Sequence, residues 1–235
     1  MMKNSSQKKK TISKMFSDIK KEYDLINRII SFRSDQIFRN IAIKKVTHLD
    51  RVVDICAGTG DMTISLLMKK SFKGRVVLCD FNYDMLSLAN LKLQKLGLRE
   101  RTDIVIGDAE ELPFKDKSFN AIIMGFALRN LESIEAFGLE SKRVIDGEGK
   151  VVLLDVSHPE NKLVAFIFHL YFYKAVPILS RFFTKKQYAY EYLPQSLKTF
   201  YNQKELISKF KGLGFTKATY QNLLWGISAI YKLGR

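Results

Sequence analysis

Two glycines and an acid follow an apolar segment in the first third of the chain. Residues 52–63 read VVDICAGTGDMT, so Gly58, Thr59 and Gly60 come soon after a run of β-branched residues. Glycine accepts backbone angles that other residues avoid and lets a ligand approach the main chain. A helix that begins after Gly60 would add free N–H groups. We therefore predict that these three residues bind a nucleotide-like ligand.

The residues around the glycines disfavour two common nucleotide ligands. A triphosphate-binding loop needs Lys and then Ser or Thr after its second glycine, whereas Gly60 is followed by Asp61 and Met62. A dinucleotide site needs a third glycine where Thr63 stands. The acids Asp54 and Asp61 suit a cationic ligand better than a pyrophosphate, because opposite charges attract strongly in a partly buried cleft.

Two further acids end apolar segments downstream. Asp80 ends RVVLCD, about twenty residues after Gly60, where a carboxylate commonly accepts from ribose hydroxyls. Asp108 ends TDIVIGD. S-adenosylmethionine fits this set, with Asp80 on the ribose, Asp108 on the adenine, and Asp54 near the sulfonium and the ammonium. Taken alone, each acid is more often a helix cap or a turn residue.

The elements that must position these residues follow an alternating pattern. Five apolar, β-branched strands separated by helical stretches are predicted at 51–55, 75–81, 102–108, 120–126 and 150–156. This alternation is typical of a parallel sheet covered on both faces, which binds ligands at the carboxyl ends of its strands. A helix over 202–214 and strands over 216–224 and 226–234 follow. The sequence predicts an α/β fold with a doubly wound, mostly parallel sheet of seven strands and an antiparallel edge.

The length of 235 residues suits a single domain. Residues 1–14 are expected to be basic and flexible, and residues 15–235 to form the domain, which opens with amphipathic helices. An aromatic-rich insertion over about 158–200 is interpreted as a helical lid. Its segment 162–183 is long enough to span a bilayer, but four residues interrupt it, so amphipathic or buried helices are expected. These are His169, Lys174, Pro177 and Arg181.

Charge and cysteine usage limit the partners. Lys and Arg outnumber Asp and Glu by 39 to 24, a net charge of +15, which attracts nucleic acid, an anionic membrane or an anionic ligand. Nucleic acid is not expected, because the lysines are scattered. Basic and aromatic residues of the insertion suit peripheral contact with a membrane. Cys56 and Cys79 lack metal-ligand spacing, so we expect no metal, and a cytoplasmic location, peripheral on the inner membrane face.

Three short segments resemble one family far more specifically than the glycine motif does. They are YDLIN (23–27), GFALRN (125–130) and YLPQS (192–196). From about Met15 to the last predicted strand, the chain resembles the ubiquinone/menaquinone biosynthesis C-methyltransferases, also called demethylmenaquinone methyltransferases. The resemblance implies the Rossmann-like fold of class I methyltransferases. It also implies methyl transfer from S-adenosylmethionine to a ring carbon of a polyprenylated quinol, leaving S-adenosylhomocysteine.

The resemblance also implies roles for individual residues. It assigns five residues to the cofactor: Thr59 in the loop, Asp80 on the ribose, Asp108 and Ala109 beside the adenine, and Gly125 at the end of the fourth strand. Tyr23, Arg129 and Asn130 fall where the family keeps polar groups near the substrate. We expect Tyr23 and Asn130 to orient the quinol oxygens. Arg129 would stabilise the oxyanion, directly or through a water that takes the proton.

Several alternatives stay open. Arg129 could instead pair with Glu132 or Glu135, and Tyr23 could be a core aromatic of the first helix. His158 could act as a base, although the family pattern does not require it. The methyl acceptor could be another small molecule or an RNA base, or the chain could be a non-catalytic lipid-binding protein of the same fold. The head group, naphthoquinol or benzoquinol, and a homodimer also stay open.

The chain departs from the family pattern at several positions. Arg33 replaces a glycine, Phe38 stands near a tryptophan position, Asp155 replaces Glu, Tyr231 replaces His, and DGEGK (146–150) replaces KPGGR. The change at 146–150 is expected in a surface turn. The changes at 33, 155 and 231 bear on the quinol class and on hydrogen bonding at the site.

Overall fold

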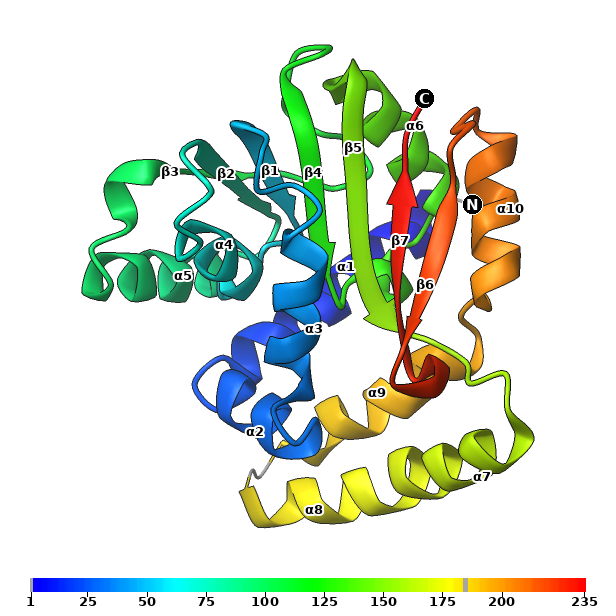
Figure 1. The fold of residues 1–235 in the computed structure, drawn as a ribbon. Coiled ribbons are helices and arrows are strands. Elements are labelled where there is room, and N and C mark those ends of the chain that lie inside the picture. Colours follow the sequence, from blue (N-terminus) through cyan, green and yellow to red (C-terminus); the bar gives the residue numbers. More distant parts are fainter. Residues whose placement is uncertain (1, 184–185) are drawn as a thin grey trace.

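A seven-stranded sheet organises the molecule (Figure 1), and the computed structural model describes residues 2–183 and 186–235. The strand order is β3-β2-β1-β4-β5-β7-β6. The strands are β1 (Arg51–Ile55), β2 (Arg75–Asp80), β3 (Thr102–Ile106), β4 (Phe119–Gly125), β5 (Ile145–Val156), β6 (Thr219–Leu223) and β7 (Ser228–Leu233). β1 to β5 pair in parallel, and β7 runs antiparallel to both β5 and β6. The predicted parallel sheet with an antiparallel edge is confirmed.

Helices cover both faces of the sheet, as the alternating pattern predicts. One face packs against α3 (Ser34–Ile43), α4 (Asp61–Leu67) and α5 (Tyr83–Lys95). The other packs against α6 (Ile134–Val144) and α10 (Gln203–Gly212). In β1, Val52 lies in the first of these cores and Val53 and Ile55 in the second, because successive strand side chains point to opposite faces. Both faces are therefore apolar, as a buried parallel sheet requires.

A third layer of helices lies beyond the carboxyl ends of β4 and β5 (Figure 1). It contains α1 (Met2–Ile19), α2 (Tyr23–Ile30), α7 (Lys162–Leu170), a π-helical turn (Tyr171–Ala175), α8 (Val176–Phe183) and α9 (Gln187–Lys198). Their buried side chains form a separate core that includes Ile26, Phe168, Val176 and Leu197. The described part of the insertion over 158–200 is therefore mainly helical and packs on the N-terminal helices.

Helix α1 extends into the lysine-rich N-terminal segment. It begins at Met2, and Ile12, Met15 and Ile19 are buried along it. This spacing of three and four residues makes one apolar stripe, which is typical of an amphipathic helix. The described part of residues 1–14 is therefore helical and continuous with the helices of the domain.

Candidate active site at the carboxyl ends of the strands

A small cavity of about 70 Å³, lined by both charged and apolar residues, lies where the parallel strands end. Five of the eight residues predicted to bind the cofactor line this smaller cavity: Gly58, Asp80, Asp108, Ala109 and Gly125. They come from the ends of β2 and β4, from the glycine loop after β1 and from the segment after β3. The sheet therefore brings together residues that are far apart in the sequence, as its topology predicts.

Asp80 fixes the shape of the glycine loop. Its Oδ2 accepts a hydrogen bond from the Gly58 N–H at 2.9 Å, and its Oδ1 accepts from the Asn82 N–H at 2.8 Å. Burial raises the pKa of Asp80 to about 6, although these backbone hydrogen bonds oppose the shift. A carboxylate oxygen can accept more than one hydrogen bond, so Asp80 can still accept from hydroxyl groups in the cavity.

The structure does not bring Asp54 to the cavity. Asp54 is fully buried and points toward α4, on the same side of β1 as Val52. Its Oδ2 accepts from the Thr63 N–H at 3.1 Å and from the Thr63 hydroxyl at 2.7 Å, which caps the first turn of α4. Burial raises its pKa to about 7. The structure therefore places Asp54 beside α4 and not among the residues that line the smaller cavity.

Gly60 also has a packing role rather than a lining one. Its φ of +78° lies in the left-handed region, and a Cβ there would fall 3.1 Å from the Ala89 Cβ of α5 and 3.3 Å from Leu78. A side chain would therefore be strained and would push α5 away from the sheet. The sequence analysis assigned Gly60 to the cofactor, whereas the structure shows it packed against α5 and not among the residues that line the smaller cavity.

Thr59 anchors helix α2 to the glycine loop. Its hydroxyl donates to Asp24 Oδ1 at 2.7 Å, and Lys92 Nζ contacts Asp24 Oδ2 at 2.8 Å. Lys92 also pairs with Asp61. The sequence analysis took Asp61 to favour a cationic ligand. In the structure the cation beside Asp61 is Lys92 of the chain itself. Thr59, Asp24, Lys92 and Asp61 form the loop cluster.

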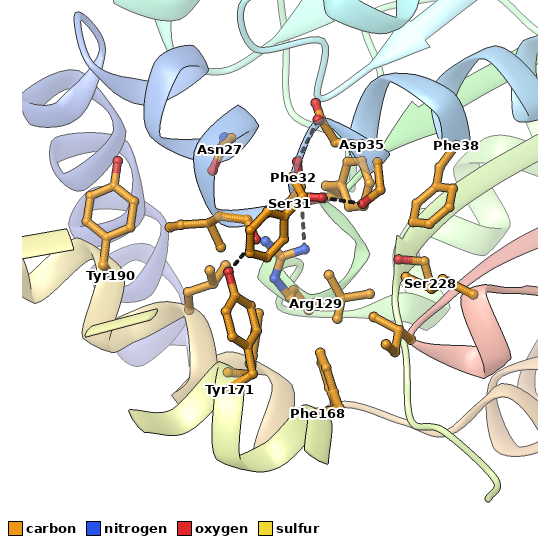
Figure 2. A pocket seen from close by; sticks show the side chains of 18 of the residues that line it. Asn27, Ser31, Phe32, Asp35, Phe38, Arg129, Phe168, Tyr171, Tyr190 and Ser228 are labelled. Carbon is orange, nitrogen blue, oxygen red and sulfur yellow. Dashed lines mark hydrogen bonds between the residues drawn. The ribbon is translucent and has the colours of Figure 1, made fainter. Parts of the chain in front are cut away.

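A larger cavity of about 420 Å³ adjoins the smaller one. Aromatic and aliphatic side chains from the helical layer line most of it, and Figure 2 shows several of them with Arg129. All three residues predicted to be catalytic, Tyr23, Arg129 and Asn130, line this larger cavity. Phe16, Tyr23, Phe126 and Asn130 line both cavities, so they form the boundary between them.

Asp155 holds the Arg129 side chain in place. Arg129 lies in the short 3₁₀ turn after β4, with a side chain only 8% exposed, and it pairs with the fully buried Asp155. Its Nη1 also donates to the Phe126 carbonyl at 2.9 Å. The alternative partners Glu132 and Glu135 are therefore not the ones used. The Asp that replaces the family's Glu at 155 still reaches the guanidinium.

Tyr23 and Asn130 line the same cavity as Arg129 and carry hydrogen-bond donors. Burial raises the pKa of the Tyr23 phenol, although Arg39 and Arg129 oppose the shift, so Tyr23 is neutral at physiological pH. The Tyr192 hydroxyl donates to Asn130 Oδ1 at 3.2 Å. The phenol of Tyr23 and the amide N–H groups of Asn130 can therefore donate hydrogen bonds to an oxygen in the cavity.

Tyr190 is a candidate that the sequence analysis missed. It lines the larger cavity and is 3% exposed, and its hydroxyl has no hydrogen-bond partner among the described residues. A buried hydroxyl without a partner is unfavourable unless a ligand supplies one. In the sequence, Tyr190 stands two residues before the segment YLPQS (192–196), and that segment alone gave it no role.

The two remaining candidates, His158 and Tyr231, lie outside both cavities. His158 contacts the Phe200 carbonyl at 3.1 Å, and Tyr231 is fully buried on β7. Neither is among the residues that line the two cavities. The departure from His to Tyr at position 231 therefore lies in the sheet core rather than at the site.

The comparisons with known proteins agree with this geometry. The model of the ubiE/COQ5 methyltransferase family matches residues 1–234. A ubiquinone/menaquinone biosynthesis C-methyltransferase UbiE from Geotalea daltonii is 31% identical and is aligned over 96% of this chain and 97% of its own length. A demethylmenaquinone methyltransferase from Staphylococcus aureus is 33% identical, over 98% of this chain and 95% of its own length.

Solved structures show the same fold at low sequence identity. An S-adenosylmethionine-dependent methyltransferase from Thermotoga maritima has a TM-score of 0.66 and 18% identity, covering 94% of this chain and 97% of that one. One from Aquifex aeolicus has a TM-score of 0.61 and 17% identity, covering 89% and 96%. The fold is that of S-adenosylmethionine-dependent methyltransferases. With the family match over nearly its whole length, the chain is a methyltransferase and belongs to the ubiE/COQ5 methyltransferase family.

Proposed function

We propose that this enzyme transfers a methyl group from S-adenosylmethionine to a ring carbon of a polyprenylated quinol, as in the conversion of demethylmenaquinol to menaquinol or the equivalent benzoquinol step. The observation that carries the proposal is the pairing of the two cavities. A small cavity with the carboxylates of Asp80 and Asp108 lies on the strand ends and adjoins a large aromatic-lined cavity. Tyr23, Arg129 and Asn130 all line the larger one. An apolar ring with a long tail suits such a lining.

The residues of the smaller cavity fit S-adenosylmethionine chemically. Asp80 would accept from the ribose hydroxyls, Asp108 and Ala109 would contact the adenine, and Gly58 leaves the backbone open to approach. At Gly125 a Cβ would fall 2.8 Å from the Met62 Cγ, so this glycine lets α4 pack closely against β4. When bound, this cofactor would supply the methyl group together with its leaving group.

Helix α1 restricts the smaller cavity. A volume of about 70 Å³ is well below the roughly 300 Å³ at which ligand pockets begin. Lys9 of α1 is among the residues that line it, and its Nζ contacts Asp108 Oδ2 at 2.6 Å and Glu110 Oε2 at 3.1 Å. We infer that α1 moves away when the cofactor enters, and that the ion pairs of Lys9 hold the closed state.

The chain's own residues would prepare the acceptor. Methylating a quinol carbon requires loss of a hydroxyl proton, which places negative charge on the oxygen and makes the ring carbon nucleophilic. After that carbon has taken the methyl group, its ring hydrogen leaves as a proton and the oxygen regains one, which restores the quinol. Arg129, held by Asp155, would stabilise that charge, and Tyr23 and Asn130 would orient the oxygens by donating to them. Arginine stays protonated, so the proton would pass to a water or to another group. The aromatic lining would keep bulk water out.

A methyl-transfer assay tests this proposal. The full chain would be incubated with labelled S-adenosylmethionine and short-tailed demethylated naphthoquinol or benzoquinol, and the product analysed by mass spectrometry. We expect one added methyl on the reduced quinol and none on the oxidised quinone, which has no hydroxyl proton to lose. Label transfer to RNA or to an unrelated phenol, with none to either quinol, would contradict the proposal. Absence of binding to S-adenosylmethionine would support a non-catalytic role.

A further inference from the structure

Helix α7 carries an apolar face that is turned away from the protein. Leu163, Phe166, Ile167 and Leu170 are spaced by three and four residues and are 68%, 67%, 58% and 51% exposed. On the opposite side of the helix, Phe168 is buried in the third core. A helix with one face in solvent normally presents polar residues there. The segment Lys162–Arg181 is apolar and long enough to cross a membrane by length and composition, but its inner face is already packed on protein.

Two turns with left-handed backbone angles expose further aromatic side chains to solvent. Phe32 and Trp225 have φ angles of +50° and +55° and are 78% and 74% exposed. The Phe32 ring lies 5.8 Å from the Tyr171 ring, whose hydroxyl donates to the Ile30 carbonyl at 2.7 Å (Figure 2). Left-handed backbone is unfavourable for such residues, so both turns are held by their surroundings.

These exposed residues surround the mouth of the larger cavity. Phe32, Ile167 and Trp225 line the cavity and are also exposed to solvent, so the cavity opens between them. We call the following set the apolar rim: Phe32, Leu163, Phe166, Ile167, Leu170 and Trp225. The rim is therefore both an apolar surface and the edge of the entrance to the site.

The helical segment that carries most of the rim holds charges of one sign only, between Glu160 and Glu191. The sequence has no Asp or Glu between Glu160 and Glu191, and within that stretch Lys162, Lys174 and Arg181 are exposed. Cations beside an apolar helix face complement anionic lipid headgroups. Two copies of the chain packed through the rim would instead bring the same cations together, on a protein that already carries a net charge of +15.

We propose that the apolar rim docks on the surface of a bilayer that contains anionic phospholipid. The rim side chains enter the acyl boundary, the three cations contact the headgroups, and the mouth of the cavity opens into the membrane. Resting on the proposed function, this arrangement lets a polyprenyl tail pass from the bilayer into the cavity without crossing water.

The single tryptophan of the chain provides a direct probe, since Trp225 belongs to the rim. Full-length protein without substrate or cofactor would be mixed with phosphatidylcholine vesicles, with or without phosphatidylglycerol. We expect a blue shift of the Trp225 emission and co-flotation with the anionic vesicles, both weakened by salt. A spectrum and flotation unchanged by anionic vesicles would overturn the proposal.

A matched pair of variants tests the rim itself. Leu163→Gln with Leu170→Gln removes apolar side chains from the rim but not from the cavity lining, and should weaken vesicle binding at least about tenfold. The control, Leu91→Gln on α5 with Leu96→Gln at its C-cap, changes leucines that are 51% and 50% exposed and should bind like wild type. Equal binding by both variants would overturn the proposal.

A second copy of the chain is the competing occupant of the rim. If the rim variant changes the oligomeric state in ultracentrifugation and leaves vesicle binding intact, the rim is a protein interface and the proposal fails. Docking and catalysis are separable, because the vesicle assay contains no quinol. Loss of methyl transfer to a water-soluble quinol with intact docking would contradict only the proposed function.

Discussion

The two cavities are built in opposite ways. The smaller one lies on the ends of parallel strands, and its central carboxylate, Asp80, is held by backbone N–H groups. The larger one lies among helices from two distant parts of the chain, α1 to α3 near the N-terminus and α7 and α9 after β5, and is mainly apolar. The sheet can therefore keep one cofactor geometry while the helices change to suit a different acceptor.

Both cavities have residues with left-handed backbone angles nearby. In the loop after β1 these residues are Cys56, Gly58 and Gly60, so two of the three are glycines. At the mouth of the larger cavity, the residues with left-handed angles include Phe32, Arg33 and Trp225, and none of these is glycine. Glycine adopts these angles without strain, so the strand-end loop is strained mainly at Cys56, whereas the helical loops are strained at each of the three large residues.

Removal of the Arg129 guanidinium should have the largest effect and should affect only the larger cavity. We expect Arg129→Gln combined with Asp155→Asn to lower kcat about 10²–10³-fold, because the charge that stabilises the oxyanion is lost. Affinity for S-adenosylmethionine, measured by calorimetry, should stay near wild type. The double change avoids a lone buried carboxylate. Asp155→Asn alone, which keeps the guanidinium, is the control, and a double variant with wild-type kcat would contradict the assignment.

The buried carboxyl of Asp54, in the sheet below the smaller cavity, should make the free energy of unfolding depend on pH. Its pKa is about 7 in the folded protein against a reference value of 3.8, so the folded state retains a proton that the unfolded state loses. The free energy of unfolding should therefore fall as pH rises between these values, by up to about 1.4 kcal/mol per pH unit from this group. Asp54→Asn should remove that slope in urea unfolding, and Asp103→Asn, on an exposed acid, should leave it. Identical slopes in wild type and Asp54→Asn would contradict the prediction.

Lys9 tests whether the smaller cavity is closed by an ion pair. Lys9→Met should raise affinity for S-adenosylmethionine by about two- to fivefold, because a partly exposed ion pair stabilises the closed state by up to about 1 kcal/mol. The dependence of this affinity on salt should weaken as well. Lys10→Met, at the exposed neighbouring lysine, is the control. Weaker binding by Lys9→Met would mean that Lys9 supports the bound cofactor instead.

Arg33 gives the smallest expected effect, at the mouth of the larger cavity. Its φ of +62° is left-handed, so Arg33→Gly should relieve strain and raise the free energy of unfolding by about 0.5–1 kcal/mol. Arg33→Ala keeps the Cβ and should give no such gain. Equal stabilisation by both would assign the effect to the arginine side chain rather than to the backbone.

Local patterns made the strands and the glycine loop predictable. Apolar runs identified all seven strands, although β5 begins at Ile145 and so includes the segment 146–150 that was expected in a surface turn. Strand-end and loop residues identified five of the residues that line the smaller cavity. The place of Asp54 beside α4 follows from the alternation of side chains along β1, which the sequence analysis did not apply to it. Pairs such as Lys9 with Asp108, 99 residues apart, depend on tertiary packing, which no local pattern contains.

Helix α2 joins the two cavities through the loop cluster. Asp24 is bound to Thr59 and Lys92, and the next residue toward the N-terminus is Tyr23, on the boundary of both cavities. A ligand that shifts the glycine loop would therefore shift Tyr23, and a ligand held by Tyr23 would act on the loop in return. By thermodynamic linkage the two effects are equal in free energy, so cofactor and acceptor would each change the affinity of the other by the same factor.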